Sequence, residues 1–303
     1  MSSIAQRLIT AVIVLLGVSS ITFLMLHLVP GDPIEVMLGE SANLADRARL
    51  RTELGLDAPL LQQWVEFHTG LLRLDFGDSL FSKKPIAAML AASIPWTVLL
   101  AVVSLVCALV IAVPLGILAA LRPNTGWDTT AATISLLGVS IPNFLLGPLL
   151  IIVFSIGLGW FPVGGNDSLG SIVLPALTLG ASLAAILSRM VRASLLEVLS
   201  EEYIVSARAR GLARGVIVVR HALPNAALPV LTIIGLQLGA LLGGAVITET
   251  IFSWPGLGQM TIEAIQRRDY PLVQACVLTI SASYVLVNTV TDLIYVRVDP
   301  RIN

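Results

Sequence analysis

The sequence contains little charge and little cysteine. Only 12% of its 303 residues are Asp, Glu, Lys or Arg, whereas soluble domains carry about 25%. A formal net charge of -1 leaves no excess of basic residues for binding phosphates, so no nucleic-acid partner is expected. The two cysteines, Cys107 and Cys276, lie inside apolar runs. We therefore expect neither a disulfide nor a metal site.

Motifs for energy conversion and catalysis are also missing. No GxxxxGK[ST] pattern occurs, so the chain cannot cradle ATP in a Walker-type loop of its own. The histidines are widely spaced without an HExxH motif, and the GAS at 180–182 lacks the glycine after serine that a nucleophile elbow needs. No cofactor and no enzymatic activity are expected of this chain. An intramembrane enzyme remains a weak alternative.

Hydrophobic residues make up 56% of the chain. A membrane-spanning helix needs about 20 apolar residues, and six stretches are long enough, which predicts an all-α integral membrane protein with six transmembrane helices. The first is read as a retained helix, because no small-x-small cleavage site follows it. The six stretches are Leu8–Val29, Trp96–Leu121, Thr129–Leu158, Ser171–Ser188, Pro229–Ile247 and Leu272–Tyr295.

The distribution of basic residues predicts that both termini are cytoplasmic. With the N-terminus inside, ten arginines fall on the inner side, and the short outer loop 159–170 contains no basic residue. This topology divides the chain into 1–95, a spanning helix plus a periplasmic segment, and 96–303, a five-helix core. Within the periplasmic segment we expect a helix ended by Gly55 and an amphipathic helix begun by Pro59.

Proline and strongly polar residues mark two of the spans. Pro142 and Pro148 should kink the third span, either as a packing irregularity or to line a pathway. Asn143 in that span and Gln237 in the fifth bring strong polarity into the membrane. No predicted span has an ionisable residue near its midpoint, which disfavours a self-contained secondary transporter without excluding it.

Three glycines share one face of the fifth span. Gly235, Gly239 and Gly243 lie at i, i+4 and i+8, a spacing that either lets a second helix approach closely or leaves room for a solute. Glu249 lies at the mouth of the same span. An ion pair or a capping role fits its position better than contact with solute.

The long polar interruption EYIVSARARGLARGVIVVRHALPNAALPV at 202–230 predicts two short helices joined at Gly211. Ser200 should cap the first helix, and Gly211 should end it with a positive φ. The second should cover about Val216–Ala222 and stop before Pro224. The loop has an apolar side that its own polar residues cannot bury, formed by Ile204, Ala207, Val216 and Val219. This side favours equally a helix that docks on a protein partner and a helix that rests on lipid headgroups.

Beyond this physical reading, EYIVSARARGL followed by HALPNAALP resembles the EAA loop of binding-protein-dependent ABC importer permeases, and most closely the peptide/nickel-type branch. LVPGDP, LGLDAPLLQQW, DFGDSL, SIPNF, ETIFSWPGLG, RDYP and DPRIN match that branch in order along the chain. One departure is Pro224, where the branch more often has a basic residue. The resemblance implies that the loop, about 200–228, couples to an ATPase through Glu202, Tyr203, Ala207, Arg208, Ala209, Gly211, Leu212, His221 and Asn225.

The same resemblance implies a type I ABC importer permease fold in a bacterial inner membrane, as a multi-pass subunit. Its expected partners are a second homologous permease, two cytoplasmic subunits that bind ATP and Mg, and an extracytoplasmic solute-binding protein. Di- or oligopeptides are the expected cargo, with nickel complexes or glutathione as alternatives in the branch. The rival from another class is the self-contained secondary transporter.

Overall fold

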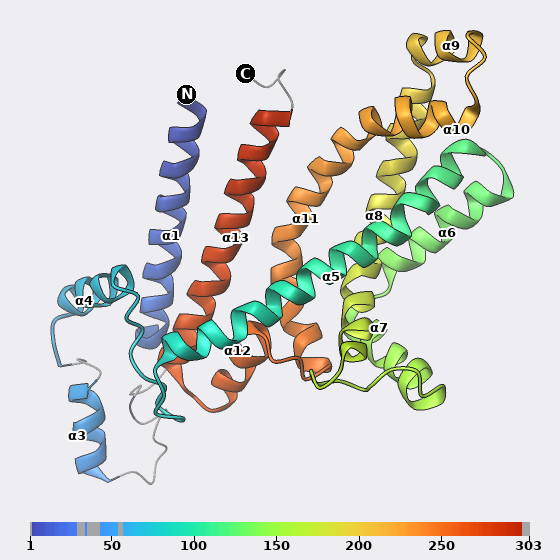
Figure 1. Ribbon diagram of the computed structural model, residues 1–303. Coiled ribbons are helices and arrows are strands. Elements are labelled where there is room, and N and C mark those ends of the chain that lie inside the picture. The colour runs from blue at the N-terminus through green and yellow to red at the C-terminus, as the bar shows by residue number, and fades with distance from the viewer. Residues whose placement is uncertain (1, 29–33, 35–42, 54–56, 299–303) are drawn as a thin grey trace. The chain divides into compact units, whose positions relative to one another are not determined.

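The computed structural model describes residues 2–28, 34, 43–53 and 57–298, and every regular element among them is helical. Only an isolated bridge between Asp78 and Pro85 departs from helix, turn or coil in this part of the chain. Gly55, the predicted helix stop, lies outside the described residues. The helices, labelled in Figure 1, are α1 (Ser2–Leu28), α3 (Leu44–Glu53), α4 (Leu60–Leu72), α5 (Ile86–Leu121), α6 (Gly126–Ser140), α7 (Asn143–Leu150), α8 (Val173–Leu199), α9 (Glu202–Ala209), α10 (Arg214–Val216), α11 (Leu223–Ile251), α12 (Leu257–Gln266) and α13 (Tyr270–Val298).

The chain packs as two compact units. The first consists of Met1–Thr97 and Pro255–Leu286, and the second of Val98–Trp254 and Val287–Asn303. Two of the three boundaries fall inside α5 and α13, and the third falls between α11 and α12. The division at residue 95 suggested by the topology stays a prediction, because the two units interleave along the chain.

The first unit is held together by a buried carboxylate as well as by apolar packing. Asp269, 1% exposed, precedes α13 and accepts hydrogen bonds from Ser79 Oγ at 2.5 Å and from the N–H of Leu80 at 3.2 Å. A buried carboxylate needs such donors. The bonds fix the turn before α5 to the turn between α12 and α13. The apolar core next to them contains Ile86, Leu90, Leu257, Ala264, Leu272, Val273, Ala275 and Cys276.

The second unit is a bundle of α5, α6, α8 and α11, drawn in green to orange in Figure 1. Helix α8 is its most enclosed member: more than half of its apolar span is buried. A Cβ added at Gly116 or Gly180 would lie 2.7 or 2.8 Å from the carbonyl oxygen of Ser188 or Ser104. These two glycines are therefore where α5 and α8 make close backbone contact.

Five helices are long and apolar enough to span a membrane, and six if one bent pair counts as a span. The pair is α6 with the segment 143–157, which meet at 105°. The predicted bend in the third span is therefore confirmed at Pro142, but it is sharper than a kink, because α6 ends at Ser140 before α7 begins. Ile141 is extended (φ -85°, ψ 116°), as a residue before proline tends to be, and Pro142 then precedes the first residue of α7.

The predicted helix end before Pro224 is also wrong. From Arg214 the helix continues through a π-helical turn, Ile217–Ala222, directly into α11. The widened turn lies immediately before Pro224, which enters in the first turn of α11, where its missing N–H costs little. Pro229 is then accommodated inside α11 instead of opening it. The side of the membrane on which the termini lie stays a prediction.

Candidate functional site

The segment after α8 folds as a short helix closed by a glycine turn. In α9 the acidic Glu202 lies in the first turn and the basic Arg208 in the last, where the helix dipole favours each charge. The N–H of Gly211 donates to the Arg208 carbonyl at 2.9 Å, and that of Leu212 to the Ala207 carbonyl at 3.4 Å. This pair of bonds is a Schellman motif, and the φ of +79° at Gly211 supplies its left-handed residue. The prediction that Gly211 ends the helix is confirmed.

The predicted cap at the start of α9 is wrong. Glu201, with extended backbone (φ -67°, ψ 146°), is the residue that precedes the helix. Ser200 instead ends α8, and its hydroxyl donates to the carbonyl of Glu197 at 2.7 Å. Only Ser200 and Glu201 lie between the two helices, and Ser200 keeps helical backbone as the C-cap of α8 (φ -89°, ψ -9°), so it does not adopt the extended conformation of an N-cap.

One side of α9 is buried against the chain's own helices. Ile204 is 0% exposed and Ala207 2%, so the expectation that the loop cannot bury its apolar side is wrong for these two residues. Val216 and Val219, 43% and 67% exposed, remain uncovered as expected. The cluster that receives α9 contains Ala120, Leu195, Ile217, Ala222 and Ala226.

Polar contacts bind α9 to the start of α11. The Tyr203 hydroxyl donates to the carbonyl of His221 at 3.4 Å and accepts from Asn225 Nδ2 at 2.9 Å. Asn225 Nδ2 also donates to the His221 carbonyl at 2.9 Å. The structure thus brings together three residues predicted for the coupling loop, and His221 takes part through its backbone.

Two arginines attach the same loop to the ends of neighbouring helices. Arg208 Nη2 donates to the Leu199 carbonyl at 3.3 Å, and Arg214 Nη2 to the Leu121 carbonyl at 2.7 Å. These are the last residues of α8 and α5, whose carbonyls lack helical partners and favour a cation. A cavity of about 340 Å³ lies beside these contacts. Arg214 was not among the predicted site residues, although its position one turn after Gly211 is visible in the sequence.

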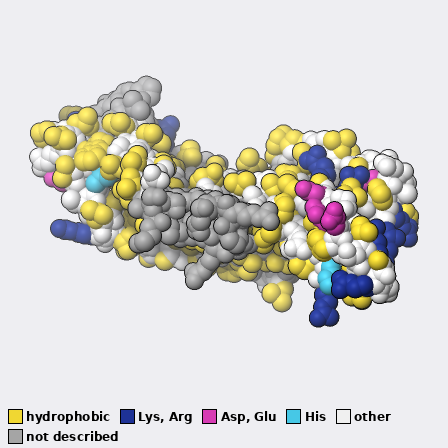
Figure 2. Space-filling model, turned by 90° about the horizontal axis from the view of Figure 1, so that it is seen from above, with side chains coloured by type: hydrophobic (Ala, Val, Ile, Leu, Met, Phe, Trp, Pro, Cys, Tyr) yellow, Lys and Arg dark blue, Asp and Glu magenta, His cyan; other side chains and the backbone are white. Residues whose placement is uncertain are grey.

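The outward side of the loop combines apolar and basic side chains. Tyr203, Val205 and Leu212 are 41%, 55% and 38% exposed, and Ala209 and Gly211 are exposed beside them. Seen from above, basic side chains, which in this segment are arginines, gather over α9 and α10 with apolar side chains between them (Figure 2). We call the exposed surface of Tyr203, Val205, Ala209, Gly211 and Leu212 the α9 face. Exposed arginines such as Arg208 and Arg210 lie beside this uncharged face, and apolar area next to arginine is common at protein-binding surfaces.

A bidentate ion pair joins α6 to α8 near the same end of the second unit. Arg192 Nε and Nη2 donate to the two oxygens of Asp128 at 2.6 and 2.7 Å, and the N–H of Asn124 donates to Oδ2 at 2.9 Å. The planar guanidinium fixes both distance and orientation. Sequence reasoning missed this pair, because the two residues are 64 positions apart.

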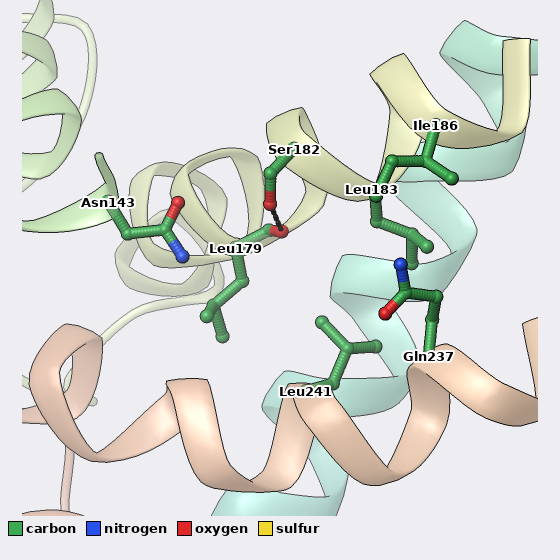
Figure 3. Close-up of a pocket in the computed structure, with 7 residues that line it drawn as sticks. All are labelled: Asn143, Leu179, Ser182, Leu183, Ile186, Gln237 and Leu241. Atoms are coloured by element: carbon green, nitrogen blue, oxygen red, sulfur yellow. Dashed lines mark hydrogen bonds between the residues drawn. The ribbon is translucent and has the colours of Figure 1, made fainter. Parts of the chain in front are cut away.

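Two of the predicted pathway residues lie at one cavity. Asn143 from α7 and Gln237 from α11 line a space of about 120 Å³ with Ser182 on α8 and apolar neighbours (Figure 3). The residues from α8 are Leu179, Ser182, Leu183 and Ile186. Their spacing of i, i+3, i+4 and i+7 defines one helix face, so the sequence contained the signal that would have added Ser182.

The other pathway candidates lie in different surroundings. Gly235 and Gly239 are buried, whereas a Cβ added at Gly243 would meet no atom within 4 Å. Glu249 is 0% exposed, so in this conformation it offers no surface to a solute. Whether the glycine face admits a second helix or a solute stays a prediction.

Comparison with known proteins covers almost the whole chain. Residues 112–303 match the model of the family described as binding-protein-dependent transport system inner membrane component, and residues 1–101 match the N-terminal model of such membrane components. The glutathione transport system permease protein GsiC of Escherichia coli strain K12 is 41% identical over 299 residues, which cover 99% of this chain and 98% of the relative. Its counterpart from Salmonella typhi is 40% identical over the same length.

Similar solved structures indicate the fold. Two inward-facing conformations of the MetNI methionine ABC transporter align with a TM-score of 0.55 each, at 23% and 24% identity. Each alignment covers 70% of this chain and 96% of the other chain. At this identity the likeness is evidence of a shared fold alone, the type I ABC importer permease fold.

Proposed function

Because the chain belongs to the family of binding-protein-dependent transport system inner membrane components, we propose that it forms the translocation pathway for short peptides, including glutathione, and that the α9 face couples it to ATP hydrolysis. As a permease subunit of an ABC importer it works with partner ATPases and a solute-binding protein. A second permease, in this proposal, completes the pathway. The proposal of this cargo rests on the 41% identity to a glutathione permease over 99% of the chain.

The polar side chains at the cavity between α7, α8 and α11 suit a cargo rich in hydrogen-bonding groups. Asn143, Gln237 and Ser182 offer amide and hydroxyl groups that pair with peptide N–H and C=O groups. At about 120 Å³ the cavity is smaller than the roughly 300–1,000 Å³ of typical ligand pockets. We therefore assign it to one side of a pathway whose other side comes from the second permease.

Coupling through the α9 face requires that α9 and the spanning helices move together. The buried Ile204, the Tyr203–Asn225 contact and the bond from Arg214 to the end of α5 connect α9 to α5, α8 and α11. A displacement of α9 by an ATPase would therefore shift the ends of three spanning helices. An interfacial helix on lipid headgroups would not need this rigid attachment, which favours the protein-docking alternative.

Uptake by a strain that lacks this permease tests the cargo. Labelled glutathione, a dipeptide, a longer peptide and Ni²⁺ are offered separately, and the intact gene is returned as the control. We expect loss of glutathione or short-peptide uptake, with restoration by the gene. Loss of nickel accumulation while uptake of all three peptides remains normal would contradict the proposal and favour the nickel alternative.

A further inference from the structure

Helix α4 leaves part of its apolar surface uncovered by the residues that the structure describes. Leu61, Val65 and Leu72 are 74%, 45% and 87% exposed. At about 100° per residue these three side chains fall within roughly 40° of one another on the helix. Gln62, Glu66 and Thr69 are exposed on a separate sector, centred about 90° away. The exposed surface of α4 therefore has an apolar side and a polar side.

A third sector of α4 packs against α1. Ser19 Oγ lies 2.9 Å from His68 Nε2, and Trp64 Nε1 donates to Ser20 Oγ at 3.1 Å. One turn further along α1, the rings of Phe23 and Phe67 lie 5.5 Å apart. His68 Nδ1 lies 2.8 Å from the Trp64 carbonyl, which can only accept, so Nδ1 carries a proton and donates. These contacts fix which side of α4 faces α1.

The contacts also place α4 along the length of α1. They fall at Ser19–Phe23, inside the apolar stretch Leu8–Met25 that qualifies α1 as a span. Met25 follows Ser19 by six residues and Phe23 by two, which at 1.5 Å per residue puts the contacts about 3–9 Å inside the end of that stretch. Helices that lie in a membrane interface bury their apolar face to a similar depth, about 5–10 Å. Figure 1 shows α4 running across α1, as a helix in the membrane plane would.

We propose that α4 is a membrane-surface helix whose Leu61, Val65 and Leu72 insert into the acyl region of the lipid leaflet next to Ser19–Phe23. The exposed apolar residues Ile21 and Leu24 of α1, 66% and 38% exposed, form a lipid-facing surface at the same depth, and the apolar side of α4 extends it. Gln62 and Glu66 point toward water and headgroups, and the amide of Gln62 donates to Glu66 Oε1 at 2.8 Å.

Spin labels on the full transporter in vesicles test this placement. Cysteines replace Leu61 or Val65 on the apolar side, and Glu66 or Thr69 on the polar side. All four side chains are exposed, so labelling leaves the packing against α1 intact. The vesicles contain phosphatidylethanolamine and phosphatidylglycerol. Collision with oxygen, which concentrates in acyl chains, is compared with collision with a water-soluble nickel chelate.

We expect labels at Leu61 and Val65 to collide more with oxygen than with the chelate, and labels at Glu66 and Thr69 to show the reverse. Ser19→Ala should shift the Leu61 label toward the chelate, because α4 loses a contact that holds it at this depth. Chelate collision at all four positions would place the helix in water and overturn the proposal. Low collision with both reagents at Leu61 and Val65 would mean that protein covers this side, and would overturn it equally.

Discussion

Two adjacent residues of α9 point in opposite directions, one into the permease and one away from it. Truncating each in turn should separate the attachment of α9 to the permease from the docking of α9 on the ATPase. Ile204 is fully buried against α8 and the start of α11, whereas Val205 is 55% exposed on the α9 face. Ile204→Ala removes buried side-chain volume, which costs about 2–5 kcal/mol. Val205→Ala changes an exposed residue, for which about 0.5 kcal/mol or less is expected. Each variant is thus the matched control of the other.

The cost of Ile204→Ala should appear as local opening of the loop. Because about 1.4 kcal/mol changes an equilibrium tenfold, 2–5 kcal/mol raises the opened population by about 30-fold to 4,000-fold. Hydrogen exchange of the amides in 201–213, measured on the permease without its ATPase, should accelerate in Ile204→Ala and stay unchanged in Val205→Ala. Equal exchange in the two variants would refute the claim that burial of Ile204 holds α9 in place.

The remaining predictions concern packing, cargo and topology. Gly116→Ala should lower the melting temperature of the purified permease, because the new Cβ overpacks a backbone contact, which costs about 1–3 kcal/mol. Gly243→Ala, where a Cβ meets no atom within 4 Å, should leave the melting temperature unchanged or raise it. Equal melting temperatures of the two variants would count against the close contact of α5 and α8. Gln237→Leu should raise the KM for peptide uptake without changing the amount of permease in the membrane, and an unchanged KM would remove Gln237 from the pathway. In intact cells, an impermeant maleimide should label Lys84→Cys but not Ser206→Cys, and the reverse pattern would invert the topology.

Local signals in the sequence predicted much of the helical structure. Pro59 precedes α4 as expected, because its fixed φ suits a helix start and its missing N–H is not needed there. Gly211 ends α9 because it adopts a positive φ without a Cβ clash. These features depend on residues within one helical turn, so the sequence alone contains them.

Features that depend on distant partners were missed or misjudged. Proline at 224 predicts a helix end, but a π-helical turn before it lets the helix continue. Ile204 and Ala207 were expected to lack cover, yet they pack in one cluster with Ala120 of α5, Leu195 of α8 and Ala226 of α11. Close backbone contacts occur at Gly116, Gly164 and Gly180, which no glycine spacing distinguished in advance. The family resemblance, in contrast, was confirmed because many short motifs match in order along the whole chain.

The central claim, that the α9 face couples the permease to its ATPase, is tested most directly at Gly211. Asp and Asn have the same shape and both tolerate left-handed backbone, and a Cβ at Gly211 meets no atom of this chain within 4 Å. Gly211→Asp and Gly211→Asn therefore differ in charge alone. The measurement is solute-stimulated ATP hydrolysis by the complete transporter in proteoliposomes. We predict loss of stimulation in Gly211→Asp, which buries an unpaired charge at the contact, with most of it kept in Gly211→Asn. Normal stimulation in Gly211→Asp would contradict the account.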